Sequence, residues 1–288
     1  MVIFTQKEAL IQALYLSNPE TGEAEKKSKI GFVPTMGALH SGHISLIERA
    51  ILDNEIVVVS IFVNPTQFNN AADLEKYPRT PSQDLSLLEN FNNKLLVYLP
   101  EISDLYGEEI VAKNYNFGGL ENEMEGKHRN GHFDGVGTVL NSFFRIINPD
   151  KAYFGEKDFQ QLLIVKKLVA IEGLPIEIVG CPILREKSGL AMSSRNERLS
   201  SEQKKEAVLI YKTLNEVKEK FHLLSIPELN QLVAERFLQN SELDLEYFEI
   251  ADEQSLKNAQ SKNKNTRYRA FIAAFMGDVR LIDNMPLN

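Results

Sequence analysis

The sequence lacks several features that would place the protein in particular classes. A single cysteine, Cys181, excludes an internal disulfide framework and a zinc site built from several cysteines. A helix needs about 18–20 consecutive apolar residues to cross a bilayer, and no apolar run in the sequence is that long. The N-terminus (MVIFTQKEAL) lacks the basic stretch, apolar segment and small-residue cleavage site of a signal peptide. We therefore expect a soluble, cytoplasmic protein.

Positive charge is also scarce. The 288 residues include 32 Lys and Arg against 40 Asp and Glu, a net charge of −8. A general nucleic-acid binder needs a basic face that replaces the counterions around phosphates, so this balance argues against that function. Residues 1–175 carry 16 Lys and Arg against 23 Asp and Glu, whereas residues 176–288 carry 16 against 17. A phosphate-bearing ligand in the first part would need backbone N–H groups, a few placed cations or a metal.

What the sequence does contain is an alternation of short apolar runs and amphipathic segments. The patterns predict strands at 30–35, 55–63, 94–99, 152–154 and 176–183, and helices at 44–52, 82–91, 136–147 and 159–172. The run EIVVVSIFV is typical of a parallel strand covered on both faces. Strands that alternate with helices predict an α/β fold with a doubly wound parallel sheet, whose ligands collect at the carboxyl ends of the strands.

The pattern changes after Pro182. It predicts two long helices and then antiparallel strands, at 201–221, 226–240, 244–251, 267–275 and 278–283. The length of the chain suits two domains, at about 100–200 residues each. We therefore predict a first domain at residues 1–180 and a smaller α+β domain at residues 181–288.

The most informative segment is PTMGALHSGH, residues 34–43, between an expected strand and an expected helix. A helix N-terminus leaves backbone N–H groups unpaired and carries partial positive charge, which favours phosphate. His40 and His43 lie three residues apart, so both can face one ligand if this turn is helical. Two alternatives stay open: a loop with capping polar groups, and a His-x-x-His metal pair, for which no third ligand follows at a motif spacing.

A second polar segment, FGEKDFQQ, also lies at a strand-to-helix junction. Lys157 suits a phosphate and Asp158 a ribose hydroxyl, with a solvated turn as the alternative. Of Gln160 and Gln161, one is a candidate to orient a carboxylate or hydroxyl, and the other is a candidate exposed residue.

The segment LAMSSRN places two hydroxyls beside a guanidinium. Ser193, Ser194 and Arg195 together suit the outer phosphates of a nucleotide. The alternative is an N-cap cluster for the next helix, although Ser200 and Ser201 already supply that cap.

Two more segments are candidates for ligand contact. Asn64 and Gln67 in FVNPTQF directly follow an expected strand, which places them at the ligand edge, although Asn-Pro is equally a turn signal. Arg129, in the Gly-rich stretch EGKHRNGHFDG, either pairs with a phosphate or carboxylate or lies in a surface loop. We interpret Cys181 and His222 as structural.

Taken together, the motifs resemble those of the pantothenate synthetase (pantoate–β-alanine ligase) family, in order and approximate spacing, from about residue 30 to residue 284. They are PTMGALHSGH, VSIFVNPTQF, YPRT, FGEKDFQQ, LAMSSRN and GDVRLIDN. The family belongs to the HxGH nucleotidyltransferases. The resemblance implies condensation of pantoate with β-alanine using ATP and Mg²⁺, through an enzyme-bound pantoyl adenylate, with release of pyrophosphate and then AMP.

The resemblance also implies an architecture and a set of partners. The expected architecture is a Rossmann-like domain for nucleotide and pantoate at residues 1–180, and a smaller lid domain at residues 181–288. Mg²⁺ would be held mainly by the phosphates of ATP, with no metal ligand from the protein. The partners would be the two small substrates and a second copy of the chain in a cytoplasmic homodimer, with no nucleic acid and no membrane.

Residue roles follow from the same resemblance. His43 is marked as catalytic, and His40, Lys157 and Arg195 join it on the phosphates. The ATP site would comprise Met36, Gly37, Ala38, Leu39, His40, Ser41, Gly42, His43, Gly155, Glu156, Lys157, Asp158, Leu184, Met192, Ser193, Ser194 and Arg195. Substrate binding would fall to Gln67 and Gln161, with Asn64 and Arg129 as further candidates.

Three other functions stay open at this point. Another HxGH nucleotidyltransferase would stop after nucleotidyl transfer and release no AMP in response to an amine. An aminoacyl-tRNA synthetase relative would need a basic tRNA surface, whereas residues 176–288 carry a charge of −1. A non-catalytic nucleotide-binding protein would bind ATP without turnover.

Overall fold

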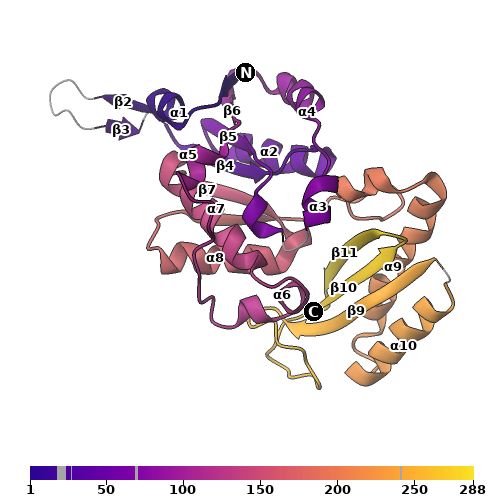
Figure 1. Ribbon diagram of the computed structural model, residues 1–288. Helices are drawn as coiled ribbons and strands as arrows, with labels where there is room; N and C mark the ends of the chain where they lie inside the picture. Colours follow the sequence, from indigo (N-terminus) through magenta and orange to yellow (C-terminus); the bar gives the residue numbers. More distant parts are fainter. Residues whose placement is uncertain (18–23, 27, 69–70, 241) are drawn as a thin grey trace. The chain divides into compact units, whose positions relative to one another are not determined.

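The computed structural model describes residues 1–17, 24–26, 28–68, 71–240 and 242–288, and the chain forms two compact units (Figure 1). Each unit has a hydrophobic core of its own. The first comprises Met1–Glu121, Glu125–Glu156 and Gln161–Cys181, and the second comprises Asn122–Met124, Lys157–Gln160 and Pro182–Asn288.

A parallel sheet forms the centre of the first unit. Its strands, in the order in which they lie side by side, are β1 (Val2–Phe4), β6 (Leu95–Tyr98), β5 (Ile56–Ile61), β4 (Ile30–Thr35), β7 (Lys151–Gly155) and β8 (Glu177–Cys181). A short hairpin of β2 (Tyr15–Ser17) and β3 (Ala24–Lys26) lies outside this sheet. The expected doubly wound parallel sheet is therefore confirmed.

The helices that accompany this sheet fill the connections between its strands. They are α1 (Lys7–Leu14), α2 (Ser41–Asp53), α3 (Ala71–Lys76), α4 (Pro81–Leu88), α5 (Ile102–Tyr106), α6 (Glu125–His128), α7 (His132–Ile147) and α8 (Phe159–Ile171). Short 3-10 turns are η1 (Pro65–Gln67), η2 (Glu89–Lys94), η3 (Leu120–Asn122) and η4 (Glu156–Asp158).

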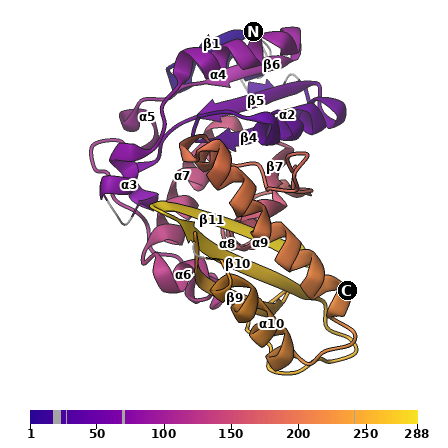
Figure 2. The ribbon, with the colours of Figure 1, turned by 90° about the vertical axis from the view of Figure 1, so that its right-hand side faces the viewer.

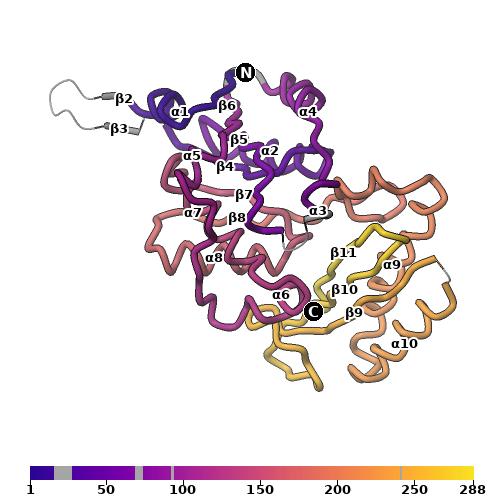
Figure 3. Tube along the Cα trace, viewed as in Figure 1, coloured from indigo at the N-terminus to yellow at the C-terminus, as the bar shows by residue number. Residues whose placement is uncertain are grey.

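The two faces of the sheet bury alternate residues of each strand. Val33 of β4 belongs to the core under α2 and α4, which includes Ile47 and Leu88. Its neighbour Phe32 points the other way, and its ring lies 5.5 Å from that of Phe143 on α7. Figures 1 and 3 show α7 and α8 together on that second face. Because both faces are covered, the strands read as continuous apolar runs.

The strand order reverses beside β4. From β4 the chain proceeds to β5 and β6 on one side, and later to β7 and β8 on the other. In open α/β sheets, ligands bind outside the carboxyl ends of the strands at such a switch point. PTMGALHSGH leaves β4 at this point, so the fold places the most informative motif where a ligand is expected.

The structure differs from the predicted elements in several places: α1, α3, α5, α6, β2 and β3 were not predicted, and two further differences have a clear cause. Helix α7 begins at His132, not at position 136, because Gly131 adopts a left-handed conformation (φ 73°) that starts the helix one turn earlier. In the missed turn, residues 132–135, the polar Asp134 and Gly135 interrupt the apolar period. Strand β1 was not predicted, since its three residues are too few for a periodic signal.

The second unit is a three-stranded antiparallel sheet with two helices on it. The strands lie in the order β11 (Val279–Pro286), β10 (Tyr268–Met276) and β9 (Leu243–Asp252), and the helices are α9 (Ser201–Lys220) and α10 (Ile226–Leu238) (Figure 2). A 3-10 turn, η5 (Ser194–Arg198), precedes α9. The even-numbered residues of β10, such as Ala270 and Ile272, pack against the helices. A polar loop, residues 253–267, joins β9 to β10 (Figure 3).

A charged cluster joins the two helices of this unit. Glu216 on α9 accepts two hydrogen bonds from Arg236 on α10, both at 2.8 Å, and one from Lys220 at 2.7 Å. These partners, Arg236 above all, lower the pKa of Glu216 to about 2, against 4.5 for an unperturbed carboxyl. Unfolding therefore raises the pKa of this carboxyl, so the cluster favours the folded state when Glu216 is ionised.

We expect Glu216→Gln to destabilise the protein by about 1 kcal/mol at pH 7. The stabilisation is full above about pH 4.5 and is lost as the pH falls toward 2. Urea unfolding midpoints at pH 7 and pH 3 measure it, with Glu219→Gln, an exposed position on the same helix, as the control. An equal difference between wild type and Glu216→Gln at both pH values would contradict the prediction.

Within the described ranges, no helix combines the length and the apolar character that crossing a membrane requires.

Candidate active site

The two histidines of PTMGALHSGH form the N-terminus of α2. His40 is the N-cap residue, and its Nδ1 accepts a hydrogen bond from the Gly42 N–H at 3.1 Å. His43, one turn on, accepts the His40 backbone N–H at its own Nδ1, at 3.3 Å. The rings lie 4.1 Å apart between centroids. The expectation that both imidazoles share one face of a helical turn is confirmed.

These hydrogen bonds decide the tautomer of both rings. A nitrogen that accepts a backbone N–H carries no proton, so each neutral imidazole is protonated at Nε2. Each Nε2–H is then a donor of the kind that binds a phosphate oxygen, beside the positive end of the α2 dipole. The hydrogen bonds that cap the helix therefore engage the Nδ1 atoms of both rings.

A buried carboxylate shapes the loop before the histidines. Asp84 on α4 accepts hydrogen bonds from the backbone N–H groups of Ala38 and Leu39, at 3.0 and 2.7 Å. Gly37 and Ala38 both have positive φ, at 80° and 49°. At Gly37 a Cβ would lie 3.0 Å from Asp84 Oδ2, so the loop needs both the glycine and the carboxylate. Asp84 was not among the candidates from the sequence, because a lone Asp within a short helix carries no signal.

Gln67 and Asn64 belong to a connected amide network after β5. Asn64 Nδ2 donates to Gln67 Oε1 at 3.2 Å and to the Gly135 carbonyl at 3.1 Å. Asn64 Oδ1 accepts from the hydroxyls of Tyr106 and Thr66. Burial raises the pKa of Tyr106, so its phenol stays protonated and donates. Asn64 is therefore saturated within the protein, and it fixes the orientation of the Gln67 amide.

With its oxygen on Asn64, Gln67 presents its Nε2 as a donor. This nitrogen contacts the sulfur of Met36, which links the segment after β5 to the segment after β4. The two motifs were expected at the same sheet edge, and here their side chains meet.

Residues at the start of helix α7, together with Arg129 just before it, contact the backbone of this segment. The buried His132 bonds through Nδ1 to the Gln67 carbonyl at 2.8 Å, and Arg129 Nη2 lies 3.5 Å from the same oxygen. At Gly135 a Cβ would lie 2.3 Å from the Thr66 carbonyl oxygen. Only glycine allows so close an approach. Arg129 was a candidate from the sequence, whereas His132, Tyr106 and Gly135 had no role predicted for them.

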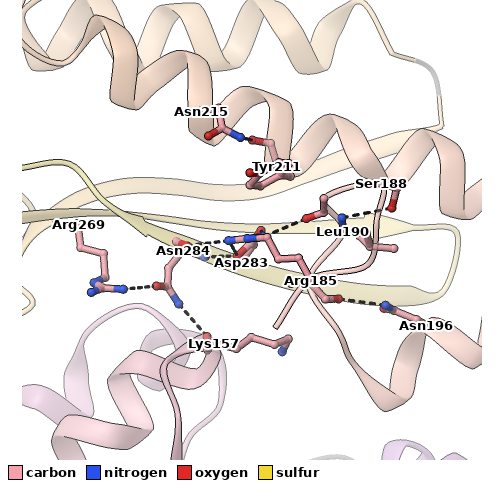
Figure 4. Close-up of polar contacts among 12 residues, drawn as sticks. Lys157, Arg185, Ser188, Leu190, Asn196, Tyr211, Asn215, Arg269, Asp283 and Asn284 are labelled. Atoms are coloured by element: carbon pink, nitrogen blue, oxygen red, sulfur yellow. Dashed lines mark hydrogen bonds and ion pairs between the residues drawn. The ribbon is translucent and has the colours of Figure 1, made fainter. Parts of the chain in front are cut away.

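The polar side chains of the FGEKDFQQ segment differ in how far they are buried. Gln160 is buried and donates to the Glu123 carbonyl at 2.7 Å, whereas Gln161 is half-buried. Lys157 is mostly buried and Asp158 is exposed, with 3.9 Å between their charged groups. The Lys157 carbonyl accepts a hydrogen bond from Asn284 Nδ2 at 2.8 Å (Figure 4).

The segment that carries LAMSSRN begins as a tight hairpin. The Arg185–Ala191 bridge and a 3.0 Å hydrogen bond from the Met192 N–H to the Leu184 carbonyl join its two sides. Ser193 then caps η5 by accepting the Arg195 N–H at 3.2 Å. Ser200, with Gln203 in a reciprocal cap, starts α9. The hydroxyls at 193 and 194 are therefore not the cap of α9.

A buried ion pair ties this hairpin to the last strand. Arg185 binds both carboxylate oxygens of Asp283, at 2.6 and 3.0 Å. Burial raises the pKa of Asp283, and the Arg185 guanidinium opposes that shift. The guanidinium also stacks 4.4 Å from the ring of Tyr211 (Figure 4). In the sequence, Asp283 and Asn284 stood out only as part of GDVRLIDN.

We searched the described residues for side chains that could hold a metal ion. Across those ranges, no group of three or more His, Cys, Asp or Glu side chains is placed to hold a metal ion. Among the residues that the structure describes, no third side chain of these types joins the His40–His43 pair.

Known proteins resemble this chain over its whole length. A family model described as pantoate-beta-alanine ligase matches residues 3–286. The pantothenate synthetase of Christiangramia forsetii is 53% identical over 288 residues, 100% of both chains. That of Flavobacterium psychrophilum is 52% identical over 263 residues, 91% of this chain and 93% of the relative.

Solved structures agree. Pantothenate synthetase from Thermus thermophilus has a TM-score of 0.88 at 36% identity, with 100% of this chain and 99% of that chain covered. Pantoate-beta-alanine ligase from Francisella tularensis, complexed with beta-gamma ATP and beta-alanine, has a TM-score of 0.79 at 36% identity, with 100% and 98% covered. With the family model spanning nearly every residue and relatives this similar along the full length, the chain belongs to the pantoate–β-alanine ligase family.

Proposed function

We propose that this chain condenses pantoate with β-alanine at the expense of ATP, through a pantoyl adenylate, with release of pyrophosphate and then AMP. One observation carries the proposal: in a chain of this family, two imidazoles lie 4.1 Å apart between ring centroids at the N-terminus of a helix, where the helix starts at the switch point of the sheet.

His40 and His43 are proposed to bind the phosphates of ATP, with the backbone of residues 36–43 beside them. Lys157 would bind phosphate and Asp158 the ribose, while Gly155, Glu156 and Leu184 complete the nucleotide contacts. Ser193, Ser194 and Arg195, with Met192, are proposed to bind the triphosphate. Near the phosphates, the positive charges of Lys157 and Arg195 would offset the excess of Asp and Glu in the first 175 residues.

Pantoate is proposed to bind Gln67 and Gln161. The Gln67 amide offers a donor to an oxygen of the hydroxy acid, since Asn64 occupies its acceptor. Asn64 therefore acts through Gln67. Arg129 would act through the backbone, since its guanidinium lies beside the Gln67 carbonyl.

The first step needs positioning more than proton transfer. The pantoate carboxylate is already ionised near pH 7, because carboxyl pKa values lie near ~4. Its oxygen forms a bond to the α-phosphorus as the bond to pyrophosphate breaks, and donors that stabilise the phosphate charge lower the barrier. In the second step the neutral amine of β-alanine attacks the acyl carbon, and the bond from that carbon to the phosphate oxygen breaks. The nitrogen loses one proton to solvent, the amide bond forms and AMP leaves.

Mg²⁺ is proposed to arrive with ATP and to be held by its phosphates, where it would neutralise charge on them. The described residues do not group into a protein site for it, so we assign no step to a metal held by the protein. The homodimer stays a prediction, which sedimentation of the purified protein would test.

An AMP-release assay tests the function. With ATP, Mg²⁺ and pantoate, we expect AMP to accumulate only when β-alanine is added. Release of pyrophosphate with no amine-dependent AMP would indicate a nucleotidyltransferase instead. ATP binding with no turnover on this acid and amine would refute the proposed reaction.

We expect Gln161→Ala to raise the KM for pantoate about tenfold, and to raise the KM for ATP much less, since a lost hydrogen bond to a charged group has about that effect. Steady-state kinetics with each substrate varied in turn measure both constants. The neighbouring Gln160→Ala is the control, because Gln160 already donates to the Glu123 carbonyl. Equal increases in both constants for Gln161→Ala would contradict its assignment to pantoate.

A further inference from the structure

The end of β11 connects to two segments that are far from it in the sequence. Asp283 binds Arg185, which begins the hairpin before Ser193–Arg195, and the next residue, Asn284, binds the backbone of Lys157 (Figure 4). All of these residues belong to the second unit. Asn284 is 2% exposed and Asp283 is 4% exposed, so both of these residues are buried and their partners Arg185 and Lys157 are partly exposed.

Hydrogen bonds to both ends of the Asn284 side-chain amide fix its orientation. Its Oδ1 accepts from Arg269 Nη1 at 2.7 Å, which leaves Nδ2 as the group that donates to the Lys157 carbonyl. Its backbone N–H donates to Asp283 Oδ1 at 2.8 Å. If the amide flipped, its NH₂ group would face the NH groups of Arg269, and two donors would oppose each other. The Asn284 side chain therefore always presents its NH₂ group to the Lys157 carbonyl.

The residue that orients Asn284 is itself held firmly. Arg269 is 5% exposed, donates to Glu253 at 2.8 Å and stacks 3.9 Å from the ring of Phe159. Phe159 follows Lys157 by two residues, at the start of α8. The FGEKDF segment is therefore held at two points by neighbouring residues of β10 and β11, once through the Lys157 carbonyl and once through the Phe159 ring.

We propose that Asn284 is a positioning residue for Lys157: it fixes the backbone from which the Lys157 side chain extends, and so sets the affinity of the protein for nucleotide phosphates. The inference rests on the proposed role of Lys157 as a phosphate ligand. An ammonium on a four-carbon stem has many rotamers, so a fixed backbone reduces the freedom that must be lost on binding.

Asn284→Asp tests the proposal with little change in volume. The aspartate still accepts a hydrogen bond from Arg269. Its second oxygen replaces the Asn284 NH₂ group, so the hydrogen bond to the Lys157 carbonyl is lost and two oxygens face each other. We expect the Kd for ATP, measured by calorimetry without pantoate, to rise about tenfold, the scale of one lost hydrogen bond with a buried acceptor left unpaired. The Kd for adenosine, which carries no phosphate, is expected to change less than twofold.

Asn215→Asp is the matched control. Asn215 also donates through Nδ2 to a backbone carbonyl, that of Tyr211, at 3.0 Å, and it has no contact with Lys157 (Figure 4). We expect this variant to bind ATP and adenosine as the wild type does. Asn284→Ala adds no charge, and it provides the same comparison if Asn284→Asp does not fold.

A double-mutant cycle with Lys157→Ala separates positioning from a general loss of structure. If Asn284 acts through Lys157, Asn284→Asp weakens ATP binding in the wild type but by less than twofold in Lys157→Ala. Equal weakening in both backgrounds, equal weakening of ATP and adenosine, or no effect on ATP would overturn the inference. Unchanged ATP binding by Lys157→Ala alone would instead refute the proposed role of Lys157.

Discussion

Replacing His43 with alanine is expected to lower the rate of adenylate formation by about 10²–10⁴-fold, the usual scale for a placed catalytic donor. The Nδ1 of His43 accepts the His40 N–H, so its Nε2 carries the proton that a phosphate oxygen would accept. Alanine removes that donor together with the cap. Pyrophosphate release in single turnover, with ATP and pantoate at saturating concentrations, measures the step.

Two further variants distinguish chemistry from helix capping at this position. His43→Asn keeps an acceptor for the His40 N–H but has no imidazole, so we expect it to recover about 1 kcal/mol of stability over His43→Ala without recovering the rate. His222→Ala, at an exposed histidine after α9, is expected to behave as the wild type. Wild-type turnover in either His43 variant would remove this imidazole from the mechanism.

Gly135→Ala is expected to lower kcat/KM for pantoate by about 10²-fold, because a shift of one ångström in a substrate-binding group has that order of effect. The new Cβ would lie 2.3 Å from the Thr66 carbonyl oxygen and 2.6 Å from the Gln67 nitrogen. Both are backbone atoms, so η1 and α7 must separate, and Gln67 moves with η1. Steady-state kinetics with pantoate varied measure the effect.

Gly137→Ala, on the same helix, provides the control for this substitution. Both changes replace a helical glycine, so each gains about the same helix propensity. At Gly137 the three atoms nearest to the added Cβ are ring atoms of Tyr115 and Phe117, at 3.0–3.1 Å. Rings can shift where backbone cannot, so we expect this variant to keep its KM for pantoate. Equal losses in the two variants would show that the tight contact with Thr66 has no special role.

The sequence was informative about elements and motifs for a physical reason. A buried strand or an amphipathic helix leaves its pattern within a window of a few residues, because burial repeats with the period of the backbone. The predicted strand at 30–35 and the helix at 159–172 therefore agree with β4 and α8 almost to the residue. The glycine-interrupted start of α7 was placed wrongly because its pattern is broken there.

Partners in hydrogen bonds leave no such pattern. Asn64 and the Gly135 carbonyl are 71 residues apart, and Lys157 and Asn284 are 127 apart. No local period relates them, and the same residue types would suit many other partners. Asp84, Tyr106, His132 and Asn284 therefore became visible as part of the candidate site only once the chain was folded.

By itself the sequence determined the α/β sheet, the second α+β unit, the histidine pair at a helix start and the resemblance to a ligase family. Only the tertiary structure decided the hydrogen bonding of those groups. It determines which nitrogen of each imidazole carries the proton, which end of the Gln67 amide is bonded to Asn64, and which side chain binds the Lys157 carbonyl. The physical reason is that residue type fixes which groups can donate or accept, whereas the folded environment fixes which of those groups are already engaged.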